Sequence, residues 1–498
     1  MHGESTIGIE GRQIMFKVIF LKELLESIHN YRLLIALILG LTIIPLGFYV
    51  NGKDYQTKYR DYQETVRMYE ESHKTIRDIT LLGGAVFRPP SPLSFLSVGV
   101  EYLFPNSIES DGSLITAFGA QTRFNNTRTL NSPLLYLYGP LDLTFIISIV
   151  ISLLAMLLTY NSVAGEKEQR TLSLILSNAV PRNLVISAKM LAYVVLLSMA
   201  FFLGILLGIF VLLIMGFEVG TGSGFTLRFS LSVVVALLYI FTFSNFGVLI
   251  SSLNKRAVSA IISLMFCWVI LFMIFPKASV IVSKIIKPVK SQQVIDLEKS
   301  QIRRQMEEEE YNELQKLRNV FPVVKDMSMP EFMTKLKQED KDAVAYDKKQ
   351  NELKEYYLAK CTAEWGRIDS FYENQRLNQT GLARDISRLS PVSCFVHLMV
   401  EISNTGLLEY RQWKQARSRL KQLLDSEISN KLRSINFGNY VSILFNGDEN
   451  APMSRIEYQS VPFRKVWPTV WPDFILLLVY GILFFLGAYV IFLKYDVR

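Results

Sequence analysis

Residues 190–215 read MLAYVVLLSMAFFLGILLGIFVLLIM, an unbroken apolar run that contains no acidic or basic side chain. An α-helix needs roughly 20 apolar residues to cross the hydrocarbon core of a bilayer. The run meets that requirement. Residues 190–215 therefore predict a membrane-spanning helix, and they place the chain among integral membrane proteins.

Five further apolar stretches have the same character. They are Leu33–Val50, Leu141–Tyr160, Phe229–Ser252, Ala257–Phe275 and Asp473–Leu493. The only carboxylates in the six stretches, those of Asp142 and Asp473, stand at the ends, where water and lipid headgroups are within reach. We therefore predict an all-α polytopic membrane protein with six transmembrane helices.

The composition agrees with this class and argues against others. Half of the 498 residues are hydrophobic, and the mean hydropathy is +0.25. The net charge is +8, but the basic residues are scattered, so nucleic acid is not an expected partner. Three cysteines and four histidines are too few and too dispersed for a metal site. Cys361 and Cys394 lie in one soluble region, and a disulfide between them remains open.

Basic residues in the short loops set the orientation, because Lys and Arg mark the cytoplasmic side of a membrane. They precede the first span, lie between the second and third and between the fourth and fifth, and close the chain: Arg12, Lys17, Lys22, Arg32, Lys167, Arg170, Arg182, Lys189, Lys255, Arg256, Lys494 and Arg498. The short loop Gly216–Arg228 carries only Arg228. Both termini are therefore predicted to be cytoplasmic, with two long loops outside.

The segment before the first span predicts an amphipathic helix. Its apolar residues recur at helical spacing among charged ones: Met15, Val18, Ile19, Leu25 and Ile28. Such a helix would lie flat on the inner leaflet, so membrane lipids are expected partners. No small-residue cleavage pattern follows the first apolar segment, and we therefore do not expect a signal peptide.

The spans divide the chain into six parts. These are the N-terminus 1–32, the span 33–50, a first extracytoplasmic region 51–140, four spans in 141–275, a second extracytoplasmic domain 276–472, and a last span with a cytoplasmic tail in 473–498. Both external regions are predicted to be mainly helical, because strand-like alternation is weak. Each contains a Ser-Pro break followed by an apolar run, RPPSPLSFLSVGVE at 88–101 and RLSPVSCFVHL at 388–398. The apolar residues of 88–101 are expected to lie against the membrane surface or a partner domain.

Motifs for nucleotide hydrolysis and other catalysis are missing from the sequence. There is no Gly-x4-Gly-Lys-Ser/Thr loop, no Gly-x-Ser-x-Gly elbow, no His-Glu-x-x-His and no Cys-x-x-Cys. The spans also lack the mid-membrane ionisable groups that ion-coupled carriers usually contain. We therefore predict a non-catalytic chain that is not a secondary transporter, and any energy that it uses must arrive from another polypeptide.

A charged segment joins the second and third spans. Residues 165–178 read GEKEQRTLSLILSN, and Leu172, Ile175 and Leu176 fall on one helical face. Glu166 and Glu168 stand near the N-terminal end, where the helix macrodipole favours negative charge. The pattern by itself favours a short amphipathic helix and an ordinary loop about equally.

Residues 160–182, which read YNSVAGEKEQRTLSLILSNAVPR, together with Lys189 resemble the signature of type 2 ABC exporter permeases. That family's pattern is roughly Gly-Glu-Lys/Arg-Glu-x-Gly-Thr-Leu, a Leu-rich turn, Ser-Asn-Pro-Val-x-Arg and a Lys. The six-span layout and the flat N-terminal helix are similar too. The Pro-Pro-Ser-Pro-Leu-Ser motif and the long second external domain resemble a subgroup with enlarged extracytoplasmic domains.

The resemblance implies that 165–178 is a coupling helix, which docks on a nucleotide-binding subunit. The residues that it assigns to coupling are Gly165, Glu166, Lys167, Glu168, Arg170, Thr171, Leu172, Ile175 and Leu176. Two positions depart from the family. Arg170 stands where Gly is usual, and Ala179 stands where Pro is usual. We expect Arg170 to alter how closely the ATPase approaches.

The resemblance also implies the partners and the location. The partners are an ABC ATPase dimer and a second permease subunit, identical or homologous, in a bacterial inner membrane. The chain itself needs no cofactor, because ATP and magnesium bind to the ATPase. Gly204 and Gly208 form a Gly-x3-Gly pair, which predicts close helix packing and is a candidate dimer seam.

Two functions follow from these expectations. In the first, the chain is the permease of an ATP-driven exporter, and closure of the ATPases pushes the 165–178 segment and tilts the adjoining spans. In the second, the same spans pass the motion to the large external domain, which acts on an extracytoplasmic partner without substrate transport. A membrane-embedded enzyme is a third class, for which no catalytic cluster appears. The sequence names no substrate.

Overall fold

In the part of the chain that the structure describes, six helical segments are long and apolar enough to cross a membrane. The computed structural model describes residues 3–29, 31–75, 84–101, 107–111, 123–125, 142–177, 181–217, 224–325, 327–338, 340–434 and 454–495. Within these ranges, the spans are α2 (Tyr31–Thr75), the continuous α5–η2–α6 (Leu143–Ile146, Ile147–Ile151, Ser152–Thr159), α9 (Arg182–Ile214), α10 (Phe225–Leu253), the continuous α11–η3–α12 (Ala257–Val269, Ile270–Ile274, Phe275–Ile286) and α20 (Phe463–Leu493). The predicted polytopic all-α fold is confirmed.

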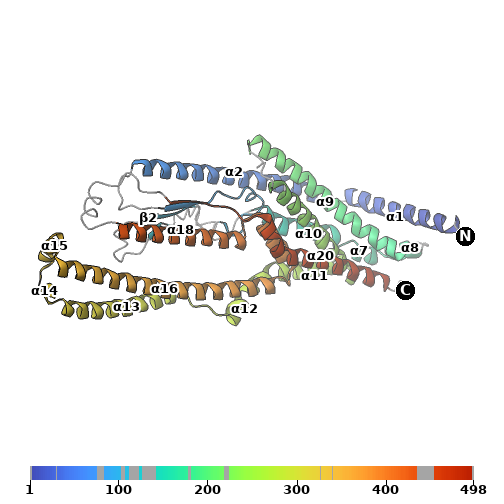
Figure 1. Cartoon of the computed structure of the whole chain (residues 1–498). Helices are drawn as coiled ribbons and strands as arrows, with labels where there is room; N and C mark the ends of the chain where they lie inside the picture. Colours follow the sequence, from blue (N-terminus) through green and yellow to red (C-terminus); the bar gives the residue numbers. More distant parts are fainter. Residues whose placement is uncertain are drawn as a thin grey trace.

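The spans form a bundle around one continuous hydrophobic core. α10 packs along α20, and α2 packs along α9. Aromatic side chains fill the interior, and the rings of Tyr239 and Phe243 have centroids 4.6 Å apart. Both chain termini lie at one end of this bundle, which we call the terminal end, and a large extramembrane domain extends from the other end (Figure 1).

Gly204 and Gly208 pack against α2 of the same chain. A Cβ atom on Gly204 would lie 2.8 Å from Ile44, and one on Gly208 would lie 2.5 Å from the Phe48 ring. The predicted close packing of these glycines therefore occurs inside one subunit. The prediction that Gly204 and Gly208 form a dimer seam is wrong, because α2 of the same chain already covers them.

Two spans contain a π-helical turn, η2 and η3. A π-turn leaves backbone groups that the regular ladder does not satisfy. The hydroxyl of Tyr239 donates to the carbonyl of Ser148 at 2.8 Å, and the hydroxyl of Ser390 donates to the carbonyl of Leu271 at 2.6 Å. Side chains of other helices thus bind at both irregular turns.

The extramembrane domain contains a four-stranded sheet. Its strands β1 (Gly84–Phe87), β2 (Ser107–Asp111), β3 (Arg123–Asn125) and β4 (Ser454–Glu457) have the order β3-β2-β1-β4. β1 runs antiparallel to β2 and parallel to β4, with Val86 opposite Ile456. Because β4 comes from the second external region, the two regions form one domain. The expectation of mainly helical regions missed this sheet.

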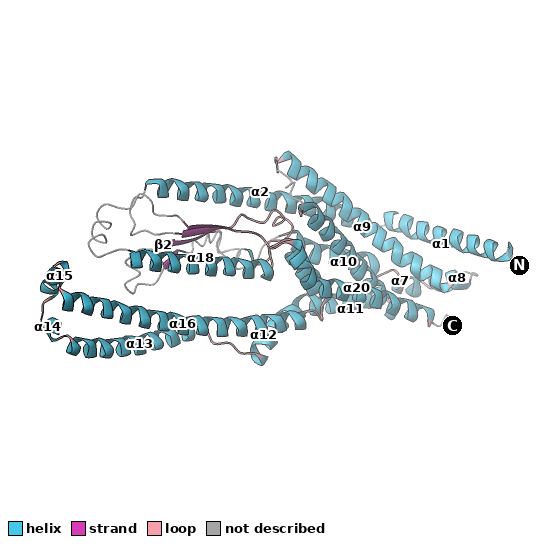
Figure 2. Ribbon diagram, in the orientation of Figure 1, coloured by secondary structure: helices cyan, strands magenta, loops and turns pink. Residues whose placement is uncertain are grey.

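Helices cover both faces of the sheet (Figure 2). Ala85 and Phe87 pack on Tyr69 of α2, which continues without a break from the first span. Val86, between them, packs on Trp413 of α18 (Leu407–Ser434). The alternation of a strand thus places one helix on each side of β1.

A long helical hairpin completes the domain. It consists of α13 (Gln292–Val320), α14 (Pro322–Lys325), α15 (Met329–Lys337) and α16 (Lys341–Ser387), and α13 packs along α16. α16 is followed by the apolar helix α17 (Pro391–Ile402), which packs against α20 and α10. Cys361 and Cys394 are free thiols, so the disulfide left open above is absent.

The Pro-rich segment 88–101 joins the domain to the bundle. Arg88 and Glu101 form a buried ion pair of 2.8 Å across it. The backbone N–H of Val98 donates to Asp142, the N-cap of α5, at 2.9 Å, and that of Val100 donates to the carbonyl of Thr405 at 2.9 Å. The segment was expected to lie against the membrane surface or a partner domain. In the structure it packs on other parts of the same chain.

Candidate functional site

The 165–178 segment consists of two short helices, α7 (Ala164–Glu168) and α8 (Thr171–Ser177), at the terminal end of the bundle. The single helix expected from the sequence is therefore wrong. Arg170 ends α7 with a φ of 59°, in the left-handed region that breaks a helix. Glycine adopts this conformation at the lowest energetic cost. This explains why glycine is usual at this position in the family signature that the segment resembles. Asn178 lies outside the described residues.

The N-terminus of α7 is fixed by α10. The hydroxyl of Ser251 accepts hydrogen bonds from the backbone N–H groups of Val163 and Ala164 at 3.1 and 3.0 Å. It donates to the carbonyl of Tyr160 at 2.8 Å. A Cβ on Gly165 would lie 2.0 Å from the Asn161 amide oxygen, so an alanine there would require the Asn161 side chain to move. The first turn of α7 is therefore held by Ser251 and packs closely against Asn161.

Glu166 binds α9 and lies near α1 (Gly3–His29). Its Oε1 accepts a hydrogen bond from Lys189 Nζ at 2.8 Å, and the same Nζ donates to Glu23 of α1 at 2.6 Å. The Lys189 side chain is 2% exposed. Lys22 of α1 also lies 4.0 Å from Glu166. One lysine thus links three helices through two carboxylates.

Lys167 binds the end of α10. Its ammonium donates to the carbonyl of Ser252, and it lies 3.4 Å from the carbonyl of Asn254. It also lies 4.7 Å from the centroid of the Tyr495 ring, just past α20. A cation at the C-terminal carbonyls of a helix is stabilised by the unsatisfied acceptors and by the helix dipole.

Glu168 binds the start of α11. Its Oε2 accepts a hydrogen bond from the backbone N–H of Ala257 at 3.0 Å. A carboxylate at this position satisfies one of the free N–H groups of a helix N-terminus. Glu166, Lys167 and Glu168 therefore connect α7 to α9, α10 and α11, respectively. The two carboxylates bind groups of other helices rather than the N-terminus of α7.

The outward surface of the segment is formed by Glu168 together with residues that do not bind the spans. Gln169, Arg170, Leu174 and Ser177 are exposed, and the Leu174 side chain is 67% exposed. Leu172 is buried in the core, and Ile175 and Leu176 pack against it. The Thr171 hydroxyl lies 3.4 Å from the carbonyl of Glu166. Of the predicted coupling residues, Glu168 and Arg170 are thus exposed, and the others are buried or half-buried.

Sequence reasoning missed four members of this site: Lys22, Glu23, Leu174 and Ser251. Glu23 lies on the face of α1 that packs against α9, where a carboxylate is unexpected. A lone charge on an otherwise apolar helix face is a signal for a buried ion pair, and it could have pointed to Lys189.

The helices of the spans also contain buried charged residues. These are Lys189 in α9, Arg228 in α10 and Asp473 in α20. Each has partners of its own, and Arg228 donates to the carbonyls of Ile402 and Val461 at 2.8 Å. Lys189 was expected at the membrane entrance, but it is buried in the structure. Among the described residues, no cluster of His, Cys, Asp and Glu could hold a metal ion.

Comparison with protein families identifies the group to which the chain belongs. The model of the ABC-2 family transporter proteins matches residues 17–497, which include all six candidate spans and the α7–α8 segment. Comparison with curated proteins found no match. Members of this family are membrane subunits of ABC transporters, which work with an ATPase partner and are generally not catalytic themselves. The chain therefore belongs to the ABC-2 transporter family, as a multi-pass permease subunit.

Proposed function

We propose that the chain couples ATP hydrolysis by a separate ATPase dimer to export, with α8 as the docking helix and α7 as the helix that distributes the motion. The observation that carries this proposal is the division of contacts within the segment. Glu166, Lys167 and Glu168 bind the ends of neighbouring spans, whereas Arg170 and Leu174 are exposed.

The geometry supports a simple mechanism. A push on Leu174 would move α8, and α8 is joined to α7 through the turn at Arg170. α7 would then displace α9 through Lys189, α10 through the Ser252 carbonyl and α11 through Ala257. In this proposal two permease subunits, identical or homologous, move together in a bacterial inner membrane, and the export path runs between them.

Two variants distinguish the docking of the ATPase on α8 from the transmission of its motion by α7. We expect Leu174→Asp to abolish co-purification with the ATPase, because a carboxylate would be desolvated at the contact. We expect Glu168→Gln to retain the ATPase but to lower the substrate transported per ATP hydrolysed. The matched control is Leu358→Asp on α16, which is 50% exposed far from the terminal end. ATPase binding that survives Leu174→Asp would refute the docking assignment.

The orientation is tested by labelling. Gln169→Cys and Glu355→Cys place single exposed thiols at α7–α8 and on α16. The natural Cys361 and Cys394 are buried and Cys267 lies within a span, so background labelling should be low. A membrane-impermeant maleimide added to intact cells should label position 355 and leave position 169 unlabelled. The opposite pattern would exclude a cytoplasmic ATPase contact at α8.

A second candidate is mechanical transmission to an extracytoplasmic partner. It is favoured by the joint between the hairpin and the last span, where buried Asp473 of α20 accepts hydrogen bonds from Arg384 at 2.6 Å and from Arg388 at 2.7 Å. These contacts tie the base of the long α16 to α20. Motion of α20 would therefore be carried to the hairpin tip.

Substrate movement separates the two candidates. Proteoliposomes that contain both subunits should accumulate substrate if the chain is an exporter. In the transmission model, ATP instead changes the distance between spin labels at the hairpin tip and on α20, and Asp473→Asn removes that change while ATPase activity remains. Transport without such a distance change would favour the exporter.

A further inference from the structure

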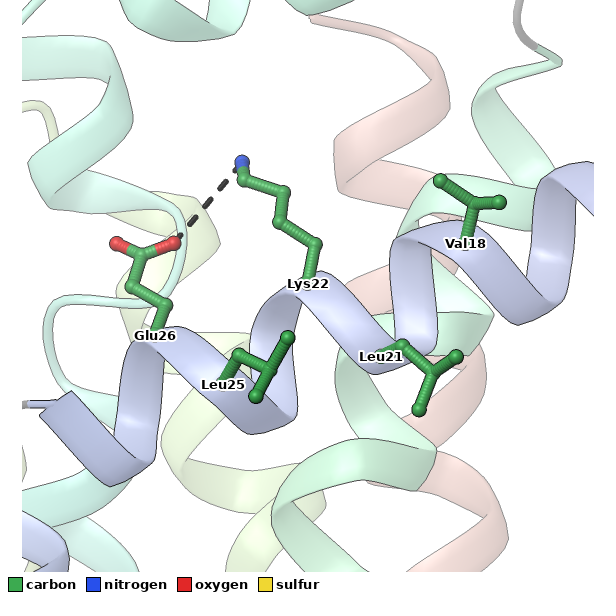
Figure 3. A pocket seen from close by; sticks show the side chains of 5 residues that line it. All are labelled: Val18, Leu21, Lys22, Leu25 and Glu26. Carbon is green, nitrogen blue, oxygen red and sulfur yellow. Dashed lines mark ion pairs between the residues drawn. The ribbon is translucent and has the colours of Figure 1, made fainter.

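The outward side of α1 carries a shallow groove with both apolar and charged walls. Val18, Leu21 and Leu25 form the apolar part, and Lys22 and Glu26 stand one helical turn apart beside them (Figure 3). Val18, Leu21 and Leu25 are exposed, together with Ile14 and Ile28 at the same helical spacing. The groove is thus part of a longer apolar stripe.

The surroundings of the stripe favour lipid as its occupant. The opposite face of α1 packs on α9, where Glu23 binds Lys189. Soon after α1 along the chain, Leu34, Ile35 and Ile38 of the first candidate span are exposed as well. Surface that continues from the lipid-facing side of a span is covered by acyl chains rather than by water.

The charges of the groove specify a headgroup. Lys22 Nζ and Glu26 Oε2 are 3.9 Å apart, which is longer than a hydrogen bond, so the Lys22 ammonium can donate to a further ligand and the Glu26 carboxylate can accept from one. Lys22 also lies 4.0 Å from Glu166. A purely anionic headgroup would place its phosphate beside two carboxylates. A zwitterionic headgroup places a phosphate on Lys22 and an ammonium on Glu26.

We propose that this groove binds a phospholipid with a primary ammonium headgroup, of the phosphatidylethanolamine class, with one acyl chain along Val18, Leu21 and Leu25. The quaternary ammonium of phosphatidylcholine has no N–H to donate to Glu26, and phosphatidylglycerol has no cation. The phosphate would compete with Glu166 for Lys22. Headgroup binding therefore reaches the ion cluster that joins α1, α7 and α9.

The test measures lipid retention on the full-length permease alone, so its result does not depend on ATPase coupling. The purified chain receives an equimolar mixture of phosphatidylethanolamine, phosphatidylcholine and phosphatidylglycerol with identical acyl chains, and bound lipids are counted by native mass spectrometry. We expect the ethanolamine lipid to be retained about two- to fivefold over the others, as one exposed charged contact allows.

Three variants locate the site. Glu26→Gln should reduce the ethanolamine lipid to the level of the choline lipid, and Lys22→Gln should lower the retention of all three. The double variant Arg67→Gln/Glu71→Gln is the matched control, because it removes an exposed pair with the same i,i+4 spacing on α2. It should leave the preference unchanged.

A photo-crosslinking residue at position 18 identifies the occupant directly. It should label phospholipid in native membranes. A crosslink to another polypeptide would show that the stripe is a protein interface and would overturn the proposal. Equal retention of the three lipids by the wild-type chain, a preference for phosphatidylglycerol, or an unchanged preference in Glu26→Gln would overturn it as well.

Discussion

Nζ of Lys189 lies 2.8 Å from Oε1 of Glu166, and this contact joins the span α9 to the short helix α7. The same ammonium lies 2.6 Å from Glu23, and its side chain is 2% exposed. Because all three charges are largely removed from water, each depends on the others for stabilisation. The cluster therefore fixes the position of α7 relative to the membrane helices.

Replacement of Lys189 by Met should be strongly destabilising. It leaves the carboxylates of Glu23 and Glu166 together without their cation, and loss of one partner from a buried ion pair costs about 3–5 kcal/mol. Denaturant unfolding of the purified chain measures the effect. Lys22→Met is the control, since this side chain is 52% exposed and its change should stay within about 1 kcal/mol. Equal losses in the two variants would contradict a central role for Lys189.

Replacement of Arg170 by Gly should stabilise the chain. Arg170 has a φ of 59°, where a residue with a Cβ costs roughly 1 kcal/mol more than glycine. We therefore expect a slightly higher melting temperature in detergent. Gln169→Gly provides the contrast, because Gln169 has a φ of −81° and gains nothing from glycine. Its melting temperature should fall slightly, and a fall for Arg170→Gly as well would contradict the argument.

The spans could be predicted from the sequence because a bilayer selects for local composition. Every predicted apolar stretch, such as Phe229–Ser252, lies within or overlaps a helix of the structure. The sheet could not be predicted, because β1 is only four residues long and is covered on both faces, so Gly84–Phe87 shows no alternation. Its parallel neighbour β4 comes from the far end of the chain, and no local pattern records that pairing.

The sequence draws attention to the segment 165–178 but does not predict its contacts. The spacing of Leu172, Ile175 and Leu176 left a helix and a loop equally open, and the non-glycine residue at 170 hides the break between α7 and α8. The roles of Glu166 and Glu168 depend on partners that are distant in sequence, Lys189 and the N–H of Ala257. Charge order along a segment carries no information about such tertiary partners.

Replacement of Gly208 by Ala should weaken the packing of α9 on α2. The new Cβ would lie 2.5 Å from the Phe48 ring, which is 1% exposed and has little room to move. Overpacking of this kind typically costs about 1–3 kcal/mol. Gly366→Ala in α16 is the matched control, because nothing lies within 4 Å of its Cβ position. Alanine there should raise stability by about 0.5–1 kcal/mol through helix propensity. The two unfolding free energies should therefore change with opposite signs.

Glu409 of α18 gives the extramembrane domain a pH dependence. Burial raises the pKa of its carboxyl above the ordinary value of 4.5, although Tyr458 Oη donates to it at 2.7 Å and the Val461 N–H donates at 3.1 Å. Arg88 acts in the opposite direction to burial, and Glu101 acts in the same direction. The folded state thus binds this proton more tightly than the unfolded state.

The sign of the effect follows from linkage. A raised folded pKa contributes stability that is complete below pH 4.5 and is lost as the pH rises through the folded pKa. Glu409→Gln keeps an acceptor for Tyr458 but cannot ionise, so it avoids this loss. The free energy of unfolding of the variant minus that of the wild type should therefore rise with pH and level off above the folded pKa. Unfolding measured at intervals between about pH 4.5 and 8 tests this, and a difference that is flat or falls with pH would contradict the burial of an ionising carboxyl at this position.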